Sequence, residues 1–232
     1  PAASTLTKSS ASSTFHSLWN EMTPVEAARD LSLQEREHNG STSITLVYGE
    51  LGPHAVLRLF QKIQQFQANV NHSSTFLDIG SGTGKMLMAA SLLLQGCTSA
   101  VGIELLQSLH EAALINVQLL NYSSTVVECI HGDALSPQTL SPKKWNDIDV
   151  VFCNATMFDE KMMRAMSRLP FKQDTLFITS TNKLDDARWN QVDEFVLDGG
   201  NWGSATKIFM YQRRDKKETM IRVMAKKMSS VR

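Results

Sequence analysis

The sequence lacks net charge, long apolar runs and closely spaced cysteines. Its 232 residues hold 23 Lys and Arg against 23 Asp and Glu, so the molecule as a whole is not an electrostatic binder of nucleic acid. No apolar run approaches the roughly 18 residues that a membrane-spanning helix needs, and no signal-peptide pattern opens the chain. Cys97, Cys129 and Cys153 lack metal-ligand spacing, so we expect no metal site, and we interpret Cys129 and Cys153, which lie in apolar runs, as structural thiols.

Composition divides the chain into three parts. Residues 1–43 form a polar segment with a short helical extension, residues 44–213 form the main domain, and residues 214–232 form a basic tail. The first 14 residues are rich in Ser, Ala and Thr, which predicts disorder. The chain does not begin with Met, as expected of part of a longer protein. From Arg213 to Arg232 there are eight Lys or Arg against two acids, which is typical of a solvated chain end or of a salt-sensitive contact with DNA.

The apolar pattern alternates between strand and helix along most of the main domain. Residues 44–50 indicate a short extended run, and Pro53 opens a helix with apolar residues at helical spacing. The pattern then predicts strands at 75–80, 99–104, 125–130, 147–154, 174–181, 192–198 and 206–212, and helices at 86–95, 108–120 and 159–169. This alternation predicts an α/β fold, a Rossmann-like and mostly parallel seven-stranded sheet with helices on both faces.

A glycine-rich loop follows the first of these strands. Residues 76–85 read FLDIGSGTGK, with Asp78 two positions before the first of three alternating glycines. Dinucleotide-binding loops carry G-x-G-x-x-G instead, which offers a helix N-terminus to a pyrophosphate. An acid at Asp78 would repel phosphate and attract a cationic sulfonium with its amino group. The spacing therefore favours S-adenosylmethionine over a ligand-free turn, and the residues expected to hold it are Asp78, Gly80, Ser81, Gly82 and Gly84.

Acids also stand at the ends of the next two strands. Glu104 ends the second strand, where a carboxylate can accept hydrogen bonds from both hydroxyls of a ribose. Asp133 follows the third strand and can accept from the amino group of adenine, with Ala134 beside it in the same site. Together with Asp78, these acids predict the class I fold of S-adenosylmethionine-dependent methyltransferases.

The end of the fourth strand bears on the methyl acceptor. Methyltransferases that act on amino groups of nucleic acids carry Asn or Asp there, followed by Pro-Pro and an aromatic residue. Asn154 is present, but Ala-Thr-Met follows it and no proline does. This departure disfavours a nucleic-acid base as the acceptor.

Three motifs occur in order along the chain. Residues 47–50 read V-Y-G-E, residues 78–84 read D-Φ-G-S-G-x-G, and residues 132–136 read G-D-Φ-L-S, with Asn154 and then Phe158 further on. This set resembles the disruptor-of-telomeric-silencing family, histone H3 lysine methyltransferases that lack a SET domain, over about Leu46 to Tyr211. The resemblance implies a nuclear chromatin regulator that methylates a lysine of histone H3 in nucleosomes, with residues 44–213 as its catalytic domain.

The resemblance also implies roles for individual side chains. Asn154 would orient the incoming amine or the methionine part of the cofactor, Tyr48 would pack near the cofactor, and Glu50 would bind its amino group or fix the loop. Because the ordinary lysine pKa is about 10.4, a narrow apolar channel is needed to favour the neutral amine. We assign that channel to Phe152, Phe158, Trp202, Phe209 and Tyr211, with a place in the core as the alternative for Phe152. The residues expected to act in catalysis are Asn154, Tyr48, Phe158, Trp202 and Phe209.

The sequence departs from the family pattern at several positions. Ala155 stands where the family has a second Asn, Lys85 where it has Gln, and Phe209 where it has the first of two tyrosines. The chain therefore resembles a compact and divergent member of protist type. Methylation of RNA, of a non-histone protein or of a small amine stays open, as does a cofactor-binding scaffold without catalysis. The sequence does not determine the oligomeric state, the target lysine or the number of methyl groups added.

Overall fold

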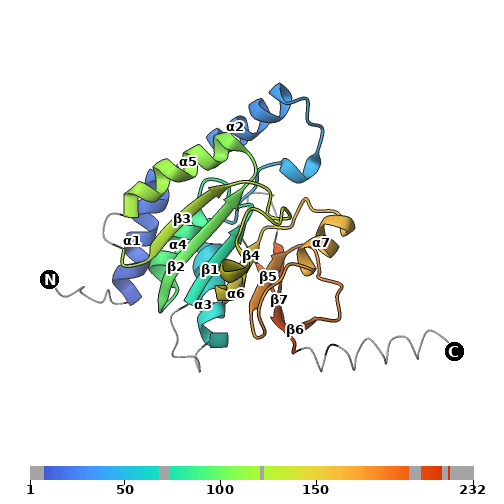
Figure 1. Cartoon of the computed structure of the whole chain (residues 1–232). Coiled ribbons are helices and arrows are strands. Elements are labelled where there is room, and N and C mark those ends of the chain that lie inside the picture. The colour runs from blue at the N-terminus through green and yellow to red at the C-terminus, as the bar shows by residue number, and fades with distance from the viewer. Residues whose placement is uncertain (1–7, 68–73, 121–122, 199–204, 216–218, 220–232) are drawn as a thin grey trace.

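The computed structural model describes residues 8–67, 74–120, 123–198, 205–215 and 219. At its centre is a seven-stranded sheet in the order β3-β2-β1-β4-β5-β7-β6 (Figure 1). The strands are β1 (Ser74–Ile79), β2 (Cys97–Glu104), β3 (Val126–His131), β4 (Val150–Cys153), β5 (Leu176–Ser180), β6 (Trp189–Leu197) and β7 (Thr206–Arg213). The helices are α1 (Lys8–Glu21), α2 (Val25–His38), α3 (Pro53–Gln67), α4 (Lys85–Leu93), α5 (Gln107–Val117), α6 (Pro142–Asp147) and α7 (Glu160–Ser167), with 3-10 turns η1 (Ile44–Leu46) and η2 (Gln118–Leu120).

Strands β1 to β5 run parallel, and β7 lies between β5 and β6, antiparallel to both. The predicted Rossmann-like, mostly parallel seven-stranded sheet is therefore confirmed, with an antiparallel C-terminal edge. The strand order reverses at β1, which pairs with β2 on one side and β4 on the other, so that Asp78 lies between Gly102 and Phe152. Open α/β sheets bind their ligands at the carboxyl ends of the strands beside such a reversal.

Alternating side chains of the strands enter two separate cores. Phe76 and Val150 face the core that contains α1, α3 and α4. Leu77 and Val151, their neighbours in sequence, face the core that contains α6 and α7. Helices thus cover both faces, as predicted. Helix α2 packs along α5, and α1 packs against α4, so the N-terminal helices lie over the first face of the sheet (Figure 1).

The disorder predicted for the first 14 residues is wrong from Lys8 onward, where α1 begins. Phe15, Trp19 and Met22 recur at helical spacing and are buried in the core shared with α3 and α4. Burial of these large side chains contributes more than the weak helix propensity of Ser and Thr costs. Residues 1–7 lie outside the described residues.

Two shorter segments also differ from the sequence-based expectation. The extended run predicted for residues 44–50 is wrong over Ile44–Leu46, which forms η1. Helix α6 was not predicted, although the hydroxyl of Ser141 caps it by accepting from the backbone N–H of Lys144 and Pro142 occupies its first position. A capping Ser followed by Pro is a helix-start signal that the hydrophobic pattern alone overlooks.

The cysteines are all free thiols. Cys97 and Cys153 are buried, and burial raises the pKa of the Cys97 thiol to about 11. No group of three or more His, Cys, Asp or Glu side chains among the described residues is arranged to hold a metal ion. Within the same ranges, no helix is both long enough and apolar enough to cross a membrane.

Candidate active site

The glycine loop leaves β1 by a sharp turn and leads into α4. The backbone N–H groups of Gly80 and Ser81 both donate to the carbonyl oxygen of Ile103, at 2.9 and 3.1 Å. Gly82 has a φ of 51°, and a Cβ atom there would lie 2.5 Å from Cε2 of Tyr48. The loop therefore requires glycine at this position for its left-handed backbone and for the close approach of the Tyr48 ring.

Glu104 ends β2 and supports the loop with its carboxylate. Its Oε2 atom accepts a 2.8 Å hydrogen bond from the backbone N–H of Gly82, and its Oε1 atom accepts one of 2.9 Å from Leu106. Burial raises the pKa of Glu104, against the lowering by these amides. Each oxygen accepts one N–H and keeps acceptor capacity for a further donor, such as a ribose hydroxyl.

Asp78 has a buried carboxyl group at the end of β1. It forms no hydrogen bond or ion pair with any residue in the described part of the chain, although its side chain is only 2% exposed. Burial raises the pKa of Asp78 well above its ordinary value, and the nearby charge of Glu104 raises it further. Such a group is stabilised by a cation, so a buried acid beside the glycine loop fits the amino group of S-adenosylmethionine.

Asp133 lies in the turn after β3. Its Oδ1 atom accepts a 2.8 Å hydrogen bond from the backbone N–H of Leu135, which holds the carboxylate in one orientation. The hydroxyl of Thr139 donates to the carbonyl oxygen of Asp133 and closes the same turn. The carboxylate itself is exposed, and Ala134 next to it is buried. Asp133 can therefore meet a ligand without moving.

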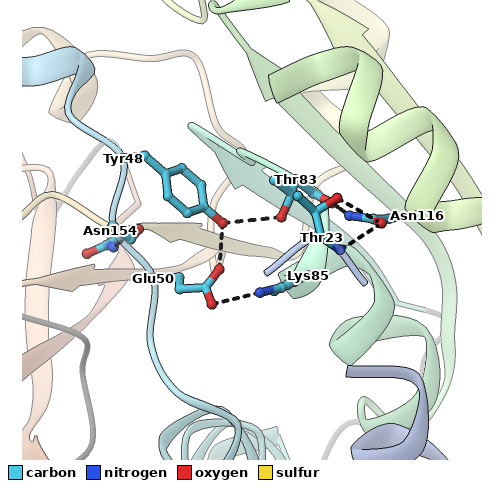
Figure 2. A network of polar contacts seen from close by, with 8 residues as sticks. Thr23, Tyr48, Glu50, Thr83, Lys85, Asn116 and Asn154 are labelled. Atoms are coloured by element: carbon cyan, nitrogen blue, oxygen red, sulfur yellow. Dashed lines mark hydrogen bonds and ion pairs between the residues drawn. The ribbon is translucent and has the colours of Figure 1, made fainter. Parts of the chain in front are cut away.

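Tyr48 is held by a network of polar contacts (Figure 2). Its hydroxyl donates to Oε2 of Glu50 at 2.5 Å and lies 3.2 Å from the hydroxyl of Thr83. The other carboxylate oxygen of Glu50 accepts a 2.7 Å bond from Nζ of Lys85. Burial and the charge of Glu50 raise the pKa of Tyr48 well above its ordinary value, so the hydroxyl keeps its proton and donates. Of the two roles expected for Glu50, these contacts fit the fixing of the loop.

Asn154 follows β4 and connects three segments through its side-chain amide. Its Nδ2 atom donates to the carbonyl oxygen of Gly49 at 2.8 Å. Its Oδ1 atom accepts from the hydroxyls of Ser180 at 2.5 Å and Thr156 at 3.0 Å. The amide therefore joins the end of β4 both to the segment that carries Tyr48 and to the end of β5.

The loop after Asn154 is held from the end of β5 by Asn182. The amide nitrogen of Asn182 donates to the carbonyl oxygens of Ala155 and Phe158, at 2.7 and 2.9 Å. Thr181, the residue before it, has a φ of 62°, a left-handed conformation that is rare for a β-branched residue. Sequence reasoning missed Asn182, because a single Asn in a loop has no spacing that marks it.

A cavity that is partly open to solvent lies at the carboxyl ends of β1 to β4. Open α/β sheets bind their ligands at this end of the strands. Of the predicted site residues, those that line it are Tyr48, Gly80, Glu104, Asp133, Ala134, Asn154 and Phe158. The residues predicted to bind the cofactor that do not line the cavity lie in the glycine loop, in the strand before it or in the network around Tyr48, and are Glu50, Asp78, Ser81, Gly82 and Gly84.

Three of the five aromatic residues expected in the acceptor channel do not line the cavity. Phe152, Phe209 and Tyr211 are 2–3% exposed and pack in the cores on either side of the sheet. They lie in the cores because β4 and β7 are interior strands of the sheet with both faces covered, so their assignment to the channel stays a prediction that these positions do not support. Phe158 is the member of the set that lines the cavity. Trp202 lies outside the described residues.

The contacts of two of these side chains explain their burial. The hydroxyl of Tyr211 accepts a hydrogen bond from the backbone N–H of Leu184 at 3.2 Å, and burial raises its pKa to about 12. The ammonium groups of Lys183 and Lys207 lie 4.9 and 5.4 Å from the ring centroid of Phe209. Phe209 therefore packs inside the sheet, where β7 pairs with β5.

Apolar residues that sequence reasoning missed complete the cavity. On the acceptor side they are Met157, Met162 and Met166, and near Glu104 they are Leu105, Leu106 and Leu109. Met162 and Met166 occupy one side of α7 at helical spacing, so the periodicity marks them as apolar-facing residues. The sequence pattern does not distinguish a residue that faces a cavity from one that fills a core.

Solved structures of similar fold are methyltransferases. The chain is similar to an RNA methyltransferase from Salinibacter ruber in complex with S-adenosyl-L-homocysteine, at 16% identity and a TM-score of 0.51, covering 68% of this chain and 92% of that one. It is similar to an O-methyltransferase from Bacillus cereus, also with S-adenosylhomocysteine, at 16% identity and a TM-score of 0.53, covering 89% and 100%. The chain is also similar to a putative class I methyltransferase from Listeria monocytogenes, at 15% identity and a TM-score of 0.55, covering 86% of this chain and 71% of that one. At these identities the likeness is one of fold, that of class I S-adenosylmethionine-dependent methyltransferases.

The family is shown by a different comparison. No curated protein matches the chain significantly. The model of the family described as histone methylation protein DOT1 matches residues 33–190, which is more than half of the chain. This range runs from α2 into β6 and includes every residue that lines the cavity. The chain belongs to the histone methylation protein DOT1 family.

Proposed function

We propose that this chain transfers methyl groups from S-adenosylmethionine to the side-chain amine of a lysine in histone H3 within nucleosomes. The observation that carries the proposal is the family match over residues 33–190, which includes both the cofactor loop and Asn154. Family and fold make the chain an S-adenosylmethionine-dependent methyltransferase. The histone H3 lysine is the finer part of the proposal.

The residues around the cavity would hold the cofactor by its polar ends. Glu104 would accept from the ribose hydroxyls, Asp133 from the adenine amino group, and Asp78 from the amino group of the methionine part. The buried carboxyl of Asp78 supports this assignment, because its ionised form would be stabilised there by the ammonium group of the cofactor. The bound cofactor supplies a methyl group on a cationic sulfur, and the protein has to orient an acceptor nitrogen toward it.

The acceptor side of the cavity suits a neutral amine. Phe158, Met157 and Met162 form an apolar wall near Asn154. An ammonium group loses hydration against such a wall, so desolvation lowers the pKa of the incoming lysine and favours the amine that can attack. Asn154 would orient that amine or the cofactor, and the hydroxyl of Thr156 beside it adds a polar group to an otherwise apolar wall.

A nucleosomal acceptor implies a nuclear protein. The basic tail after Arg213 would then contact DNA phosphates, and salt would weaken this contact. Residues 216–218 and 220–232 of the tail lie outside the described residues, so its contribution is proposed from charge alone.

The test is transfer of tritium from labelled S-adenosylmethionine to nucleosomes, free histones and total RNA in parallel. We expect label on histone H3, at a lysine that mass spectrometry then locates, with nucleosomes as the better acceptor. Label on RNA alone would refute the proposal. Binding of the cofactor without label on any acceptor would favour the non-catalytic scaffold.

Paired variants connect the label to this site. Asn154→Ala removes the amide beside the acceptor wall and should abolish transfer to histone. Asn146→Ala changes the same residue type on the exposed surface of α6 and should leave transfer unchanged. Full histone activity in the Asn154→Ala variant would refute the role proposed for Asn154.

A further inference from the structure

A buried ion pair lies behind the cofactor cavity. Nζ of Lys85 is 2.7 Å from Oε1 of Glu50, and the two side chains are only 6% and 13% exposed. Lysine is rarely buried this deeply unless it is paired. Lys85 is the first residue of α4, directly after the glycine loop, whereas Glu50 belongs to the segment that carries Tyr48. The pair therefore connects the segment that carries Tyr48 to the start of α4.

The ammonium of Lys85 has a second partner from the N-terminal part of the chain. The indole ring of Trp19, on α1, has its centroid 4.9 Å from Nζ of Lys85. An aromatic face at this distance stabilises a cation. Trp19 is itself buried in the core that contains α1, α3 and α4. The position of Lys85 is thus set both by Glu50 and by a helix that lies before the main domain.

A second chain of contacts leads from the same N-terminal region to the same tyrosine. The backbone N–H and the hydroxyl of Thr23 lie 3.1 and 3.2 Å from Oδ1 of Asn116. Nδ2 of Asn116 donates to the carbonyl oxygen of Thr83 at 2.8 Å, and the hydroxyl of Thr83 meets that of Tyr48. Figure 2 shows that the Tyr48 hydroxyl contacts Glu50, which pairs with Lys85, and also Thr83, which Asn116 and Thr23 support.

We propose that Lys85 is a positioning residue for the cofactor, which acts through Glu50 on Tyr48, and that Trp19 of α1 belongs to the same arrangement. Tyr48 lines the cavity and its ring lies against Gly82, so a shift of the ring changes the space for the cofactor. Without Lys85, the buried carboxylate of Glu50 loses the ammonium group that lies 2.7 Å from its Oε1 atom, and the loss of a charge partner is costly in a buried site.

The proposal rests on cofactor binding and not on the histone acceptor. Its test is therefore the calorimetric affinity of the full chain for S-adenosylhomocysteine, measured without any acceptor. Lys85→Met should weaken binding by roughly tenfold or more, whereas Lys85→Arg keeps the charge and should stay within about threefold of the parent. Trp19→Leu should weaken binding and Trp19→Phe, which keeps an aromatic face, should weaken it less.

A matched control separates this pair from ion pairs in general. Lys144→Met removes a more exposed ion pair, with Glu128, in which neither residue lines the cavity, and should leave the affinity unchanged. The melting temperature of each variant is measured in parallel. If Lys85→Met does not fold, Lys85→Gln and the two Trp19 variants carry the same test.

The route through Tyr48 is tested by combining variants. If Lys85 acts through Tyr48, Lys85→Met should cause little further loss of affinity in a Tyr48→Phe background, whereas independent effects would multiply. A general structural role would lower the melting temperature without this dependence on the Tyr48 hydroxyl. Wild-type affinity in a folded Lys85→Met variant, or the same loss of affinity in both backgrounds, would overturn the proposal.

Discussion

The side-chain amide of Asn154 donates a 2.8 Å hydrogen bond to the carbonyl oxygen of Gly49, 105 positions earlier in the chain. Gly49 stands between Tyr48 and Glu50, on the cofactor side of the cavity, and Asn154 begins the loop on the acceptor side. The hydroxyl of Ser180 holds the oxygen of the same amide from β5. A single side chain thus sets the distance between the segments that would hold the donor and the acceptor of the methyl group.

Asn154→Asp isolates this connection. The carboxylate can still accept from Ser180 and Thr156, but it cannot donate to the carbonyl oxygen of Gly49 and repels it. We expect kcat to fall by about 100-fold, since a misplacement of about 1 Å costs that much in transfer reactions. Single-turnover label transfer measures the effect, with Asn146→Asp on the exposed surface of α6 as the control. An unchanged kcat in the Asn154→Asp variant would contradict this role.

Gly82→Ala tests the contact between the glycine loop and Tyr48. The new methyl group would meet Cε2 of Tyr48 at 2.5 Å and displace the ring from the cavity wall. Gly40→Ala is the matched control, because Gly40 has a similar φ of 61° but no atom within 4 Å of the added Cβ. Both variants should lose about 1–2 kcal/mol of stability from backbone strain. The affinity for S-adenosylhomocysteine should fall in Gly82→Ala alone, and equal affinities in the two variants would exclude the clash.

Substitution of Phe209 should lower mainly the stability of the protein, whereas substitution of Phe158 should lower mainly its activity. Phe209→Ala opens a hole in the core and should cost about 3–5 kcal/mol of unfolding free energy, measured by urea denaturation. The milder Phe209→Leu variant should remain folded and keep its activity. Phe158 lines the cavity, so Phe158→Ala should lower activity more than it lowers stability. A large loss of activity in a stable Phe209→Leu variant would restore Phe209 to the acceptor channel.

Asp78 should couple cofactor binding to a proton. Its pKa is raised by burial and by the charge of Glu104, so its neutral form is favoured in the folded chain without cofactor. The stability that this protonation contributes is present below the ordinary carboxyl pKa and is lost as the pH rises through the raised one. Asp78→Asn should remove this loss and raise the melting temperature of the unbound protein at neutral pH.

Binding of the cofactor should reverse the preference of Asp78 for its neutral form. An ammonium group favours the carboxylate, so binding of S-adenosylhomocysteine should release a proton between the ordinary and the raised pKa. Calorimetry in buffers of different ionisation enthalpy measures this proton. The Asp78→Asn variant should bind S-adenosylhomocysteine more weakly and release fewer protons on binding. The Asp30→Asn variant, on the exposed surface of α2, should match the parent in both measurements. Equal proton release by the Asp78→Asn variant and the parent would mean that another group titrates.

The sheet and the cofactor loop could be predicted from local sequence. The strand that carries Asp78 reads STFLDI, and its apolar residues Phe76, Leu77 and Ile79 point to both faces, as expected of a parallel strand that is covered on both sides. The glycines that follow need left-handed backbone, which their lack of a Cβ atom makes available. Helix α1 escaped prediction because its apolar positions are spread among Ser and Thr, and they are buried only by packing against α3 and α4.

The candidate site was predicted less completely than the fold, and its residue roles stay predictions. Four predicted residues line one cavity, namely Tyr48, Glu104, Asp133 and Asn154. They could be predicted because each stands at the end of a predicted strand or in a motif. Asn182 has no such mark, and its hydrogen bonds to Ala155 and Phe158 depend on β5 lying next to β4.

The local sequence therefore determines the order of the strands and helices, through apolar periodicity, and the glycine turn, through backbone freedom. It also places the acids at the ends of the strands. Contacts between distant segments account for the rest. They bury Phe209 where resemblance suggested a channel, and they pair Glu50 with Lys85. Packing around a residue sets the direction of its side chain and, for a buried charge, its partner. Lys85 packs against Trp19 of α1, a helix that the local sequence pattern did not predict.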